Sequence, residues 1–266
     1  MFDLAALEAE LAGTVFAGKL HFARVTGSTN ADAIAAARGD AQNIGGPHGS
    51  VYFADEQLAG RGRGDHGWVS VAGEGLYVSI LLRPQIPVSR LTLLPLAAGL
   101  AAAEAIRAVT GLTVDLRWPN DLLIGSRKAG GILVESQTDA STVSYAVVGI
   151  GINVHQRAFP SDLATPATSL DFEAGRAISR QALLAALLKS LEREAPALAD
   201  EAAAKGIPAR VEQASTWIRG HNVEVHGPQS CTGVTAGLDE NGFLRVATAS
   251  GLVTVQTGGL RAAEEN

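Results

Sequence analysis

Residues 112–153 read LTVDLRWPNDLLIGSRKAGGILVESQTDASTVSYAVVGIGIN, a part of the chain dense in β-prone residues. Three strands are predicted there in close succession, at 112–117, 128–136 and 142–152. The segment Pro119-Asn120-Asp121 between the first two has the composition of a turn. The stretch therefore predicts part of a β-sheet.

Helices and further strands are predicted around this stretch. Hydrophobic spacing predicts helices at 2–12, 31–37, 89–109 and 179–193, and strands at 20–25, 50–54 and 75–82. Pro95 marks either a kink in the third helix or its start. Residues 155–178 have no strong periodicity and predict a functional loop. One stripe of the last helix is predicted to face the core: Leu183, Leu184, Leu187, Leu188 and Leu191.

The pattern changes near residue 213. Short β-prone runs follow at 222–226, 231–237, 243–247 and 252–256, and glycine-containing turns separate them. Short strands with regular turns in about fifty residues predict a small β-barrel. The chain is therefore expected to divide into residues 1–212 and residues 213–266.

The composition excludes several classes of protein. Of the 266 residues, 47% are hydrophobic and 18% charged, which is typical of a globular chain. The formal net charge of −6 disfavours a general binder of nucleic acid or anionic membranes. The one cysteine, Cys231, permits no intrachain disulfide or Cys-based zinc site. With no signal peptide apparent and the apolar run 91–103 too short to span a bilayer, we expect a soluble, cytoplasmic protein.

The segment Gly60-Arg61-Gly62-Arg63-Gly64 is the strongest candidate for a binding site. Its glycines let the backbone approach a ligand closely, and its arginines bring fixed charge with planar donor groups. A flexible solvated loop and an arginine–glycine element for single-stranded nucleic acid are the alternatives. The acidic net charge and the single short occurrence favour a loop that wraps a small anion.

A second candidate is Arg117-Trp118-Pro119-Asn120-Asp121, which Lys128 and Gly130-Gly131 follow. Asn120 and Asp121 have an alternative role as simple turn formers. Lys128 begins a mostly apolar strand, so its ammonium group is either partly buried and in need of an anionic partner or exposed at the surface.

A third candidate is Gly149-Ile150-Gly151-Ile152-Asn153, in which glycines alternate on one face of a strand. They leave room for a ligand or another backbone. The dinucleotide fingerprint is excluded because its third glycine and following helix are missing, and no P-loop, nucleophile elbow or metal-binding His pair is present.

Taken in order and spacing, these motifs resemble those of the biotin–protein ligases over roughly residues 25–155. The C-terminal part, with Gly258-Gly259-Leu260-Arg261, is similar to the SH3-like appendage of that family. The resemblance implies an α/β (α+β) fold like that of class II aminoacyl-tRNA synthetases, with a mixed, mainly antiparallel sheet and helices on one side. The motifs that carry it are Gly27-Ser28-Thr29-Asn30, Ala54-Asp55-Glu56-Gln57, Gly60-Arg61-Gly62-Arg63 with Trp68, Trp118-Pro119-Asn120-Asp121, Arg127-Lys128 with Gly130-Gly131-Ile132-Leu133-Val134-Glu135, and Gly149-Ile150-Gly151-Ile152-Asn153.

The resemblance also implies a two-step reaction and its site. Biotin and ATP form biotinyl-5'-AMP, and a lysine of a biotin carrier domain then takes the biotinyl group. Lys128 and Arg63 would be catalytic, Asn120, Asp121 and Asn153 would bind the nucleotide, and Asp121 would hold Mg²⁺. Biotin or its adenylate would contact Ser28, Thr29, Asn30, Gln57, Gly60, Arg61, Gly62, Arg63, Trp68, Lys128, Gly130, Gly131 and Gly151.

Two features limit the resemblance. The stretch Gly64-Asp65-His66-Gly67 departs from the family pattern, since Asp65 adds negative charge where the family commonly has a further basic residue. The first motif begins at residue 27, which leaves too little chain for the DNA-binding domain of some members, so no DNA partner is expected. The resemblance implies a carboxylase carrier domain as the protein partner. It also implies that two chains pair through sheet edges.

Two other functions remain open from the sequence. A lipoate–protein ligase uses related chemistry on a similar fold, although the paired arginines followed by Trp68 favour biotin. A non-catalytic module, in which the C-terminal barrel binds protein or nucleic acid, is the other. The presence of Lys128, Arg63 and Asp121 together argues against it.

Overall fold

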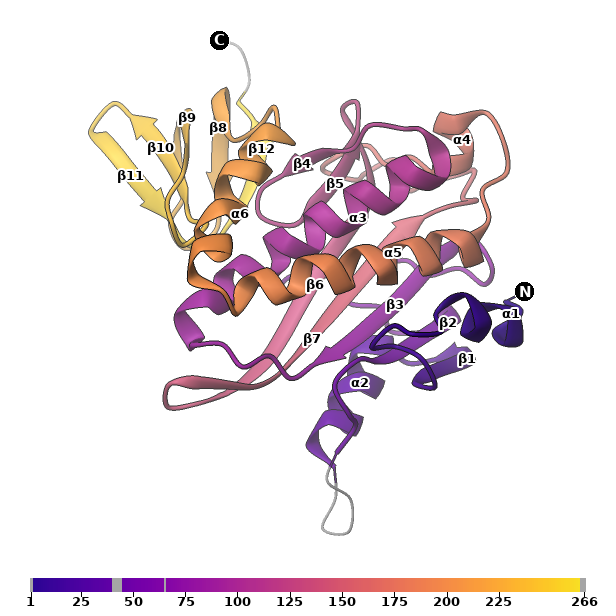
Figure 1. The fold of residues 1–266 in the computed structure, drawn as a ribbon. Helices are drawn as coiled ribbons and strands as arrows, with labels where there is room; N and C mark the ends of the chain where they lie inside the picture. The colour runs from indigo at the N-terminus through magenta and orange to yellow at the C-terminus, as the bar shows by residue number, and fades with distance from the viewer. Residues whose placement is uncertain (1, 40–44, 65, 264–266) are drawn as a thin grey trace.

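The computed structural model describes residues 2–39, 45–64 and 66–263, which form two β-sheets and a layer of helices (Figure 1). The larger sheet has seven strands in the order β1-β2-β3-β7-β6-β5-β4. Only β1 and β2 pair in parallel, and the other neighbours are antiparallel. The prediction of a mixed, mainly antiparallel sheet is confirmed. Its strands are β1 (Leu20–Thr26), β2 (Ser50–Gln57), β3 (Gly75–Leu82), β4 (Asp115–Arg117), β5 (Asp121–Ile124), β6 (Arg127–Asp139) and β7 (Thr142–Asn153).

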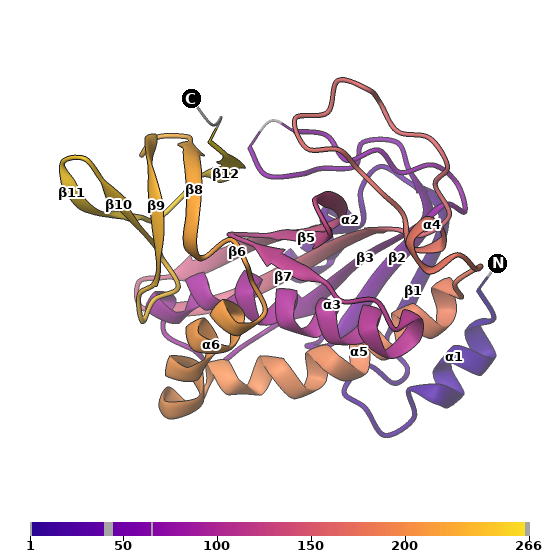
Figure 2. The same cartoon turned by 90° about the horizontal axis from the view of Figure 1, so that it is seen from above.

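Most of the helices cover one face of this sheet, with α3 and α5 side by side across it (Figures 1 and 2). α3 begins one residue before Pro95, so the proline marks its start. The leucine stripe of α5 is fully buried, as predicted. The helices are α1 (Leu4–Glu10), α2 (Thr29–Arg38), the 3-10 helix η1 (Val88–Leu93), α3 (Leu94–Thr110), α4 (Leu170–Ala174), α5 (Arg180–Glu194), the 3-10 helix η2 (Ala195–Leu198) and α6 (Glu201–Gln213).

The expectation of helices on one side only is wrong for α2. In Figure 2 this helix lies across the sheet from α3 and α5. Its Ala33 and Ala37 pack in a separate buried cluster with Leu81, Tyr145 and Val147 of the sheet. Two small alanines let the helix approach closely, and this places its N-terminus over the centre of the sheet.

The second sheet contains the four predicted C-terminal strands and one more. They are antiparallel, in the order β11-β10-β9-β8-β12. Its link to the large sheet includes a hydrogen bond from Trp118 Nε1 to the carbonyl oxygen of Gly242, at 3.0 Å. The strands are β8 (Arg219–His226), β9 (Cys231–Leu238), β10 (Leu244–Thr248), β11 (Gly251–Val255) and β12 (Gly259–Ala262).

Three short or irregular elements were missed by hydrophobic spacing. α6 contains Pro208 in its interior and Gly206, both unfavourable in a helix. It is held by Ala204, Ile207 and Val211, which are buried in the main core. β5 is only four residues long, and α4 lies inside the segment that was expected to be a loop. Tertiary packing fixes these elements where local preference is weak.

The continuous helical run Val88–Thr110 is longer than the apolar segment 91–103. At 23 residues it is, within the described residues, the one helix long and apolar enough to cross a membrane. Here 56% of its most apolar window is buried inside the protein. Ala97, Ala98, Ala101 and Ala102 are fully buried in the core. Their small size lets α3 lie close to its neighbours.

Truncation of the α5 stripe tests the core. Leu187→Ala should lower the free energy of unfolding by about 2–4 kcal/mol, because a fully buried leucine leaves a cavity. Denaturant unfolding followed by circular dichroism measures the loss. Arg193→Ala on the same helix removes an exposed ion pair with Glu104 and a hydrogen bond to the Ser190 hydroxyl, and should cost about 1 kcal/mol or less. Equal losses in the two variants would contradict the assigned core.

Candidate active site on the glycine face of the sheet

The two faces of β7 differ sharply in side-chain size. Val148, Ile150 and Ile152 are buried in the main core with the helices. Gly149 and Gly151 alternate with them and therefore face the opposite side. A Cβ atom at Gly149 would overlap the side-chain amide of Asn30, and one at Gly151 would lie 2.6 Å from the Trp68 indole. Gly149 and Gly151, which we call the glycine floor, thus leave space that the side chains of Asn30 and Trp68 occupy.

A β-bulge brings Lys128 onto this same face. Leu122 pairs with Gly130 but Leu123 pairs with Lys128, so Ala129 is an extra residue in β6. A bulge shifts the alternation of side chains by one position. The Lys128 side chain consequently passes over Gly131, whose Cβ position would be 3.6 Å from Lys128 Nζ.

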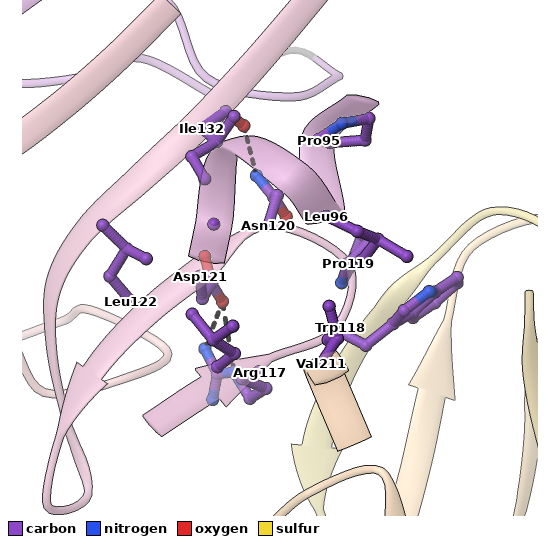
Figure 3. Close-up of a pocket in the computed structure, with 12 residues that line it drawn as sticks. Pro95, Leu96, Arg117, Trp118, Pro119, Asn120, Asp121, Leu122, Ile132 and Val211 are labelled. Atoms are coloured by element: carbon purple, nitrogen blue, oxygen red, sulfur yellow. Dashed lines mark hydrogen bonds and ion pairs between the residues drawn. The ribbon is translucent and has the colours of Figure 1, made fainter. Parts of the chain in front are cut away.

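Asp121 is the anion that pairs with Lys128. Its Oδ1 lies 2.5 Å from Lys128 Nζ and its Oδ2 lies 2.6 Å from the Arg117 guanidinium (the latter pair is drawn in Figure 3). Side-chain exposures of 28% for Lys128, 14% for Asp121 and 7% for Arg117 show that the cluster is partly withdrawn from water. Lys128 is therefore a semi-buried, paired cation rather than a surface lysine.

The electrostatic balance at Asp121 favours its charged form. Burial by itself would raise the pKa of this carboxyl, but the charges and hydrogen bonds of Lys128 and Arg117 together hold the pKa below its ordinary value. Arg117 also donates to Thr165 Oγ1 at 2.9 Å and stacks over the Trp217 ring at 5.1 Å. These contacts fix the arginine at the border between the two sheets.

The arginine–glycine segment is the turn of an irregular hairpin rather than a loose loop. Gln57 pairs with Ser70 and Arg61 with Gly67, and Trp68 N–H donates to the Gly60 carbonyl oxygen at 2.9 Å. A Cβ atom at Gly60 would overlap the carbonyl oxygen of Trp68, so the hairpin requires glycine there. The hairpin places the Trp68 indole over the glycine floor, with Lys128 Nζ 5.7 Å from the ring centroid. The buried indole Nε1–H has no hydrogen-bond partner among the described residues.

Arg63, at the tip of the hairpin, reaches the second sheet. Its guanidinium donates to the Gly258 carbonyl oxygen at 2.8 Å and to Thr257 Oγ1 at 3.2 Å. Burial lowers the pKa of Arg63 below its ordinary value, and the carboxylate of Asp121 opposes that shift. The charge of Asp121 thus favours the charged form of Arg63.

A chain of hydrogen bonds runs along the other end of the floor. Gln57 Oε1 accepts from Thr29 N–H at 2.9 Å and from the Thr29 hydroxyl at 3.0 Å. The Ser79 hydroxyl lies 2.7 Å from Thr29 Oγ1 and donates to Asn30 Oδ1 at 2.5 Å. All four side chains belong to segments that converge where α2 begins.

The chain ends in an acidic group that fixes a second arginine. Asn30 Nδ2 donates to Glu135 Oε2 at 2.8 Å, and the Arg61 guanidinium bonds to the same oxygen at 2.8 Å. Ser28, Thr29, Asn30 and Ser79 are all buried. The result is a buried cluster of polar side chains with fixed donors and acceptors, next to Gly149 and Gly151 of β7.

Asn120 and Asn153 hold backbone segments in place. Asn120 Nδ2 donates to the Ile132 carbonyl oxygen at 2.8 Å, beside a narrow crevice of about 10 Å³ against α3 (Figure 3). Asn153 Nδ2 donates to the carbonyl oxygens of Thr168 and Lys128, at 3.0 and 3.4 Å. Both amides therefore shape the surroundings of Lys128.

The structure thus brings most of the predicted site residues together on one face of the sheet. Gly130 is an exception: a Cβ there would meet the Gly151 carbonyl and Leu122, so this glycine serves strand packing. Spacing alone missed Ser79 as part of the site, and it assigned no role to Arg117 and Glu135 although both stand in the quoted motifs. A polar residue inside the fully buried strand GLYVSILL was the available signal for Ser79.

No built metal site accompanies this cluster. Within the described ranges, no group of three or more His, Cys, Asp or Glu side chains is placed to hold an ion. Both Asp121 oxygens already accept from cations. The residues present fit Mg²⁺ only as an ion that arrives with the phosphates of a nucleotide, and Asp121 as its ligand stays a prediction.

Known proteins share this fold and these motifs. Residues 23–153 match the model of the biotin/lipoate A/B protein ligase family. The chain is 34% identical over 246 residues to the biotin–[acetyl-CoA-carboxylase] ligase of Mycobacterium tuberculosis, covering 88% of this chain and 85% of the relative. The solved biotin protein ligase of Aquifex aeolicus in complex with biotin and ATP superposes with a TM-score of 0.78 at 29% identity, covering 92% of this chain and all of that one.

Another relative covers a shorter region. The bifunctional ligase/repressor BirA of Bacillus subtilis is 40% identical over 153 residues, which is 57% of this chain and 47% of that protein. The chain thus spans about half the length of this relative. The matched family model covers biotin and lipoate protein ligases as one class. Within that class, the chain belongs to the biotin protein ligase family.

The charge cluster predicts a pH dependence of stability. The folded-state pKa of Asp121 lies below its unfolded value, so its contribution is present above the unfolded pKa of about 4 and is lost as pH falls through the folded value. Asp121→Asn should cost about 3 kcal/mol or more at pH 7, because two cations lose their partner, and progressively less below pH 4. Denaturant unfolding of both proteins from pH 7 to pH 3 measures this difference, and a constant difference would contradict it.

Proposed function

We propose that this protein is an ATP-dependent biotin–protein ligase. In the first step a biotin carboxylate oxygen attacks the α-phosphorus of ATP, the bond between the α-phosphorus and the α,β-bridging oxygen breaks, and pyrophosphate leaves. In the second, a lysine amine of the acceptor attacks the acyl carbon of biotinyl-5'-AMP, loses a proton, and AMP leaves. The observation that carries the proposal is the pair of cations, Lys128 and Arg117, on the carboxylate of Asp121, with Arg63 as a third cation at the tip of the hairpin.

That charge balance suits a reaction between two anions. Three cations and one carboxylate leave an excess of two positive charges beside the glycine floor. A carboxylate and an α-phosphate repel each other in water, and fixed cations in a partly buried site offset that repulsion. Because the chemistry needs position and charge rather than an enzyme nucleophile, no Ser/His/Asp arrangement is required.

Each end of the proposed site suits one part of the substrate. The polar cluster of Ser28, Thr29, Asn30 and Gln57 would hydrogen-bond the ureido ring of biotin, while Gly131 and Gly151 leave room for its apolar body. The Trp68 indole, which now covers that floor, would then pack against the bound ligand. Gly60, Arg61, Gly62 and Arg63 would close over it.

At the charged end, Lys128 would exchange Asp121 for the substrate carboxylate and the α-phosphate. Arg63 would contact the phosphate, and Asn120, Asp121 and Asn153 would lie toward the nucleotide. ATP would bring Mg²⁺ on its phosphates, with Asp121 as the carboxylate nearest to it. The ion's contribution would be to neutralise phosphate charge.

Further properties belong to the same proposal. Residues 1–212 would be the catalytic domain, with a class II synthetase-like fold, and residues 213–266 an SH3-like barrel. The carrier domain of a biotin-dependent carboxylase would be the acceptor in the cytoplasm. β5 pairs with β6 only as far as Gly131, and in the described part of the chain the rest of that β6 edge has no strand partner, which supports pairing of two copies there.

One assay tests the proposal directly. A biotin carrier domain incubated with this protein, ATP, Mg²⁺ and biotin should gain the mass of one biotinyl group on a lysine. Lipoate offered in place of biotin separates this function from lipoate ligation. Transfer of lipoate but not biotin would overturn the proposal, and calorimetry that detects no biotin binding would favour a non-catalytic module.

Removal of the central cation should disable the first step. Lys128→Ala should slow adenylate formation on the order of 10²–10³-fold, because a charged contact in the transition state is lost. Pyrophosphate release with biotin and ATP measures the rate. Lys189→Ala, which removes a surface lysine paired with Glu10, is the control and should be unaffected. Wild-type rates in Lys128→Ala would refute the role of this lysine.

Removal of the Ser79 hydroxyl should weaken biotin recognition. Ser79→Ala leaves Asn30 Oδ1 and Thr29 Oγ1 without their shared partner, so the polar cluster loses its fixed orientation. The KM for biotin should rise about tenfold while the KM for ATP stays constant. Ser136→Ala, at an exposed position on β6, serves as the control. An unchanged KM for biotin in a folded Ser79→Ala protein would contradict this role.

A further inference from the structure

Arg63 is the contact between the glycine–arginine hairpin and the C-terminal sheet. Its two hydrogen bonds reach Thr257 and Gly258, which follow Arg63 in the chain by 194 and 195 positions. These two residues lie in the turn that connects β11 to β12. We call residues 256–258 the strap. Figure 2 shows the hairpin and β12 on the same side of the large sheet.

The strap is itself a built structure. The side-chain oxygen of Gln229 accepts from the backbone N–H groups of Gln256 and Thr257, at 2.8 and 3.4 Å. The Gln229 amide donates to the Thr254 carbonyl oxygen at 3.3 Å. Gly258 packs so closely on β8 that a Cβ atom there would lie 2.7 Å from the His226 carbonyl oxygen. The strap therefore offers Arg63 a fixed pair of acceptors.

The backbone around Arg63 is held by hydrogen bonds within the hairpin turn, from Gly62 N–H to the His66 carbonyl oxygen at 2.7 Å and from His66 N–H to the Arg63 carbonyl oxygen at 3.4 Å. These bonds do not fix the direction of the Arg63 side chain. Gly62 and Gly64 flank this arginine, and Gly64 has a φ of +61°, in the left-handed region. Glycine on both sides leaves this tip the freedom to move. Neither Asp65 nor His66 adds a fixed cation to the tip. The position of the Arg63 guanidinium consequently depends on what its side chain binds.

A guanidinium group has enough donors to bind the strap and an anion together. It carries five N–H donors in one plane. The strap takes one from each terminal nitrogen, so the remaining donors are available to a phosphate. Binding to two acceptors on the strap also fixes the plane of the guanidinium, which reduces the freedom lost when a ligand binds.

From this geometry we infer that Thr257 is a positioning residue: the strap holds Arg63 toward the phosphate of biotinyl-5'-AMP and so slows release of the intermediate before transfer. The inference rests on the proposed function. It gives the C-terminal sheet a specific part in retaining the intermediate, through a contact that needs no catalytic group of its own.

Thr257→Val tests the inference, since valine keeps the shape of threonine and removes the hydroxyl. Labelled adenylate is formed on the whole protein from labelled biotin and ATP. The complex is then diluted rapidly into unlabelled biotinyl-5'-AMP, and the rate at which label leaves the protein is measured. Release should be about fivefold faster in Thr257→Val, because one hydrogen bond to a charged group is lost. Thr257→Ser should restore the wild-type rate, and the affinity for biotin without ATP should not change.

Two further variants complete the design. Thr254→Val makes the same substitution on β11, where no side-chain contact to Arg63 exists, and should release adenylate at the wild-type rate. Gly258→Ala must shift the strap away from β8 and should accelerate release in the same direction as Thr257→Val. Thermal unfolding shows whether each variant is folded before its rate is compared.

The possible outcomes distinguish a failure of the proposed function from a failure of the role assigned to the strap. If the wild-type protein forms no adenylate, the proposed function fails. If it does and Thr257→Val matches Thr254→Val, the strap has no role. Slower release from Thr257→Val would show that the strap competes with phosphate for Arg63, and it would also overturn the inference. A parallel loss of biotin affinity without ATP would indicate a general structural effect instead.

Discussion

The central sheet packs against α3 and α5 on one face and carries Asn30 and Trp68 over glycines on the other, and β7 contributes to both faces. Its valine and isoleucine residues pack under α3 and α5, while Gly149 and Gly151 give up side-chain volume on the opposite face. A side chain at Gly149 would collide with Asn30, and one at Gly151 with Trp68. The whole polar cluster therefore depends on two missing Cβ atoms in one strand.

A β-bulge in β6 brings the charged groups to the same face of the sheet. Lys128 would face away from Gly131 in a regular strand, and the extra residue Ala129 turns it toward the floor. The carboxylate of Asp121 pairs with both Lys128 and Arg117 and so offsets the repulsion between these two cations. A carboxylate held charged between two cations keeps the site preorganised for anions before any ligand arrives.

The contacts between the two sheets bear on the same cluster. Arg117 lies against Trp217 at the start of the second sheet, and Arg63 bonds to the strap near its end. Two of the three cations thus touch the C-terminal part of the chain. Its residues thus meet the charged end of a site whose other parts come from the larger sheet and the N-terminus of α2.

The resemblance to a known family implied the class of the sheet. The sequence itself determined the long strands, the core stripe of α5 and the residues of the binding motifs. These follow from periodicities and short spacings, which act locally along the chain. It did not place α2 across the sheet from the other helices, find α6 with its internal Pro208, or mark Ser79 as part of the polar cluster. Each of these depends on packing between distant segments.

The arginine–glycine segment shows the division most clearly. Its composition alone was compatible with a flexible loop, a nucleic-acid element or an anion clamp. Only the fold paired Gln57 with Ser70, laid Trp68 on the glycines and bound Arg63 to a turn 195 residues away. Sequence fixes which groups are available, because that is covalent. The tertiary structure decides which of them meet, because distance and burial arise only when remote segments pack together.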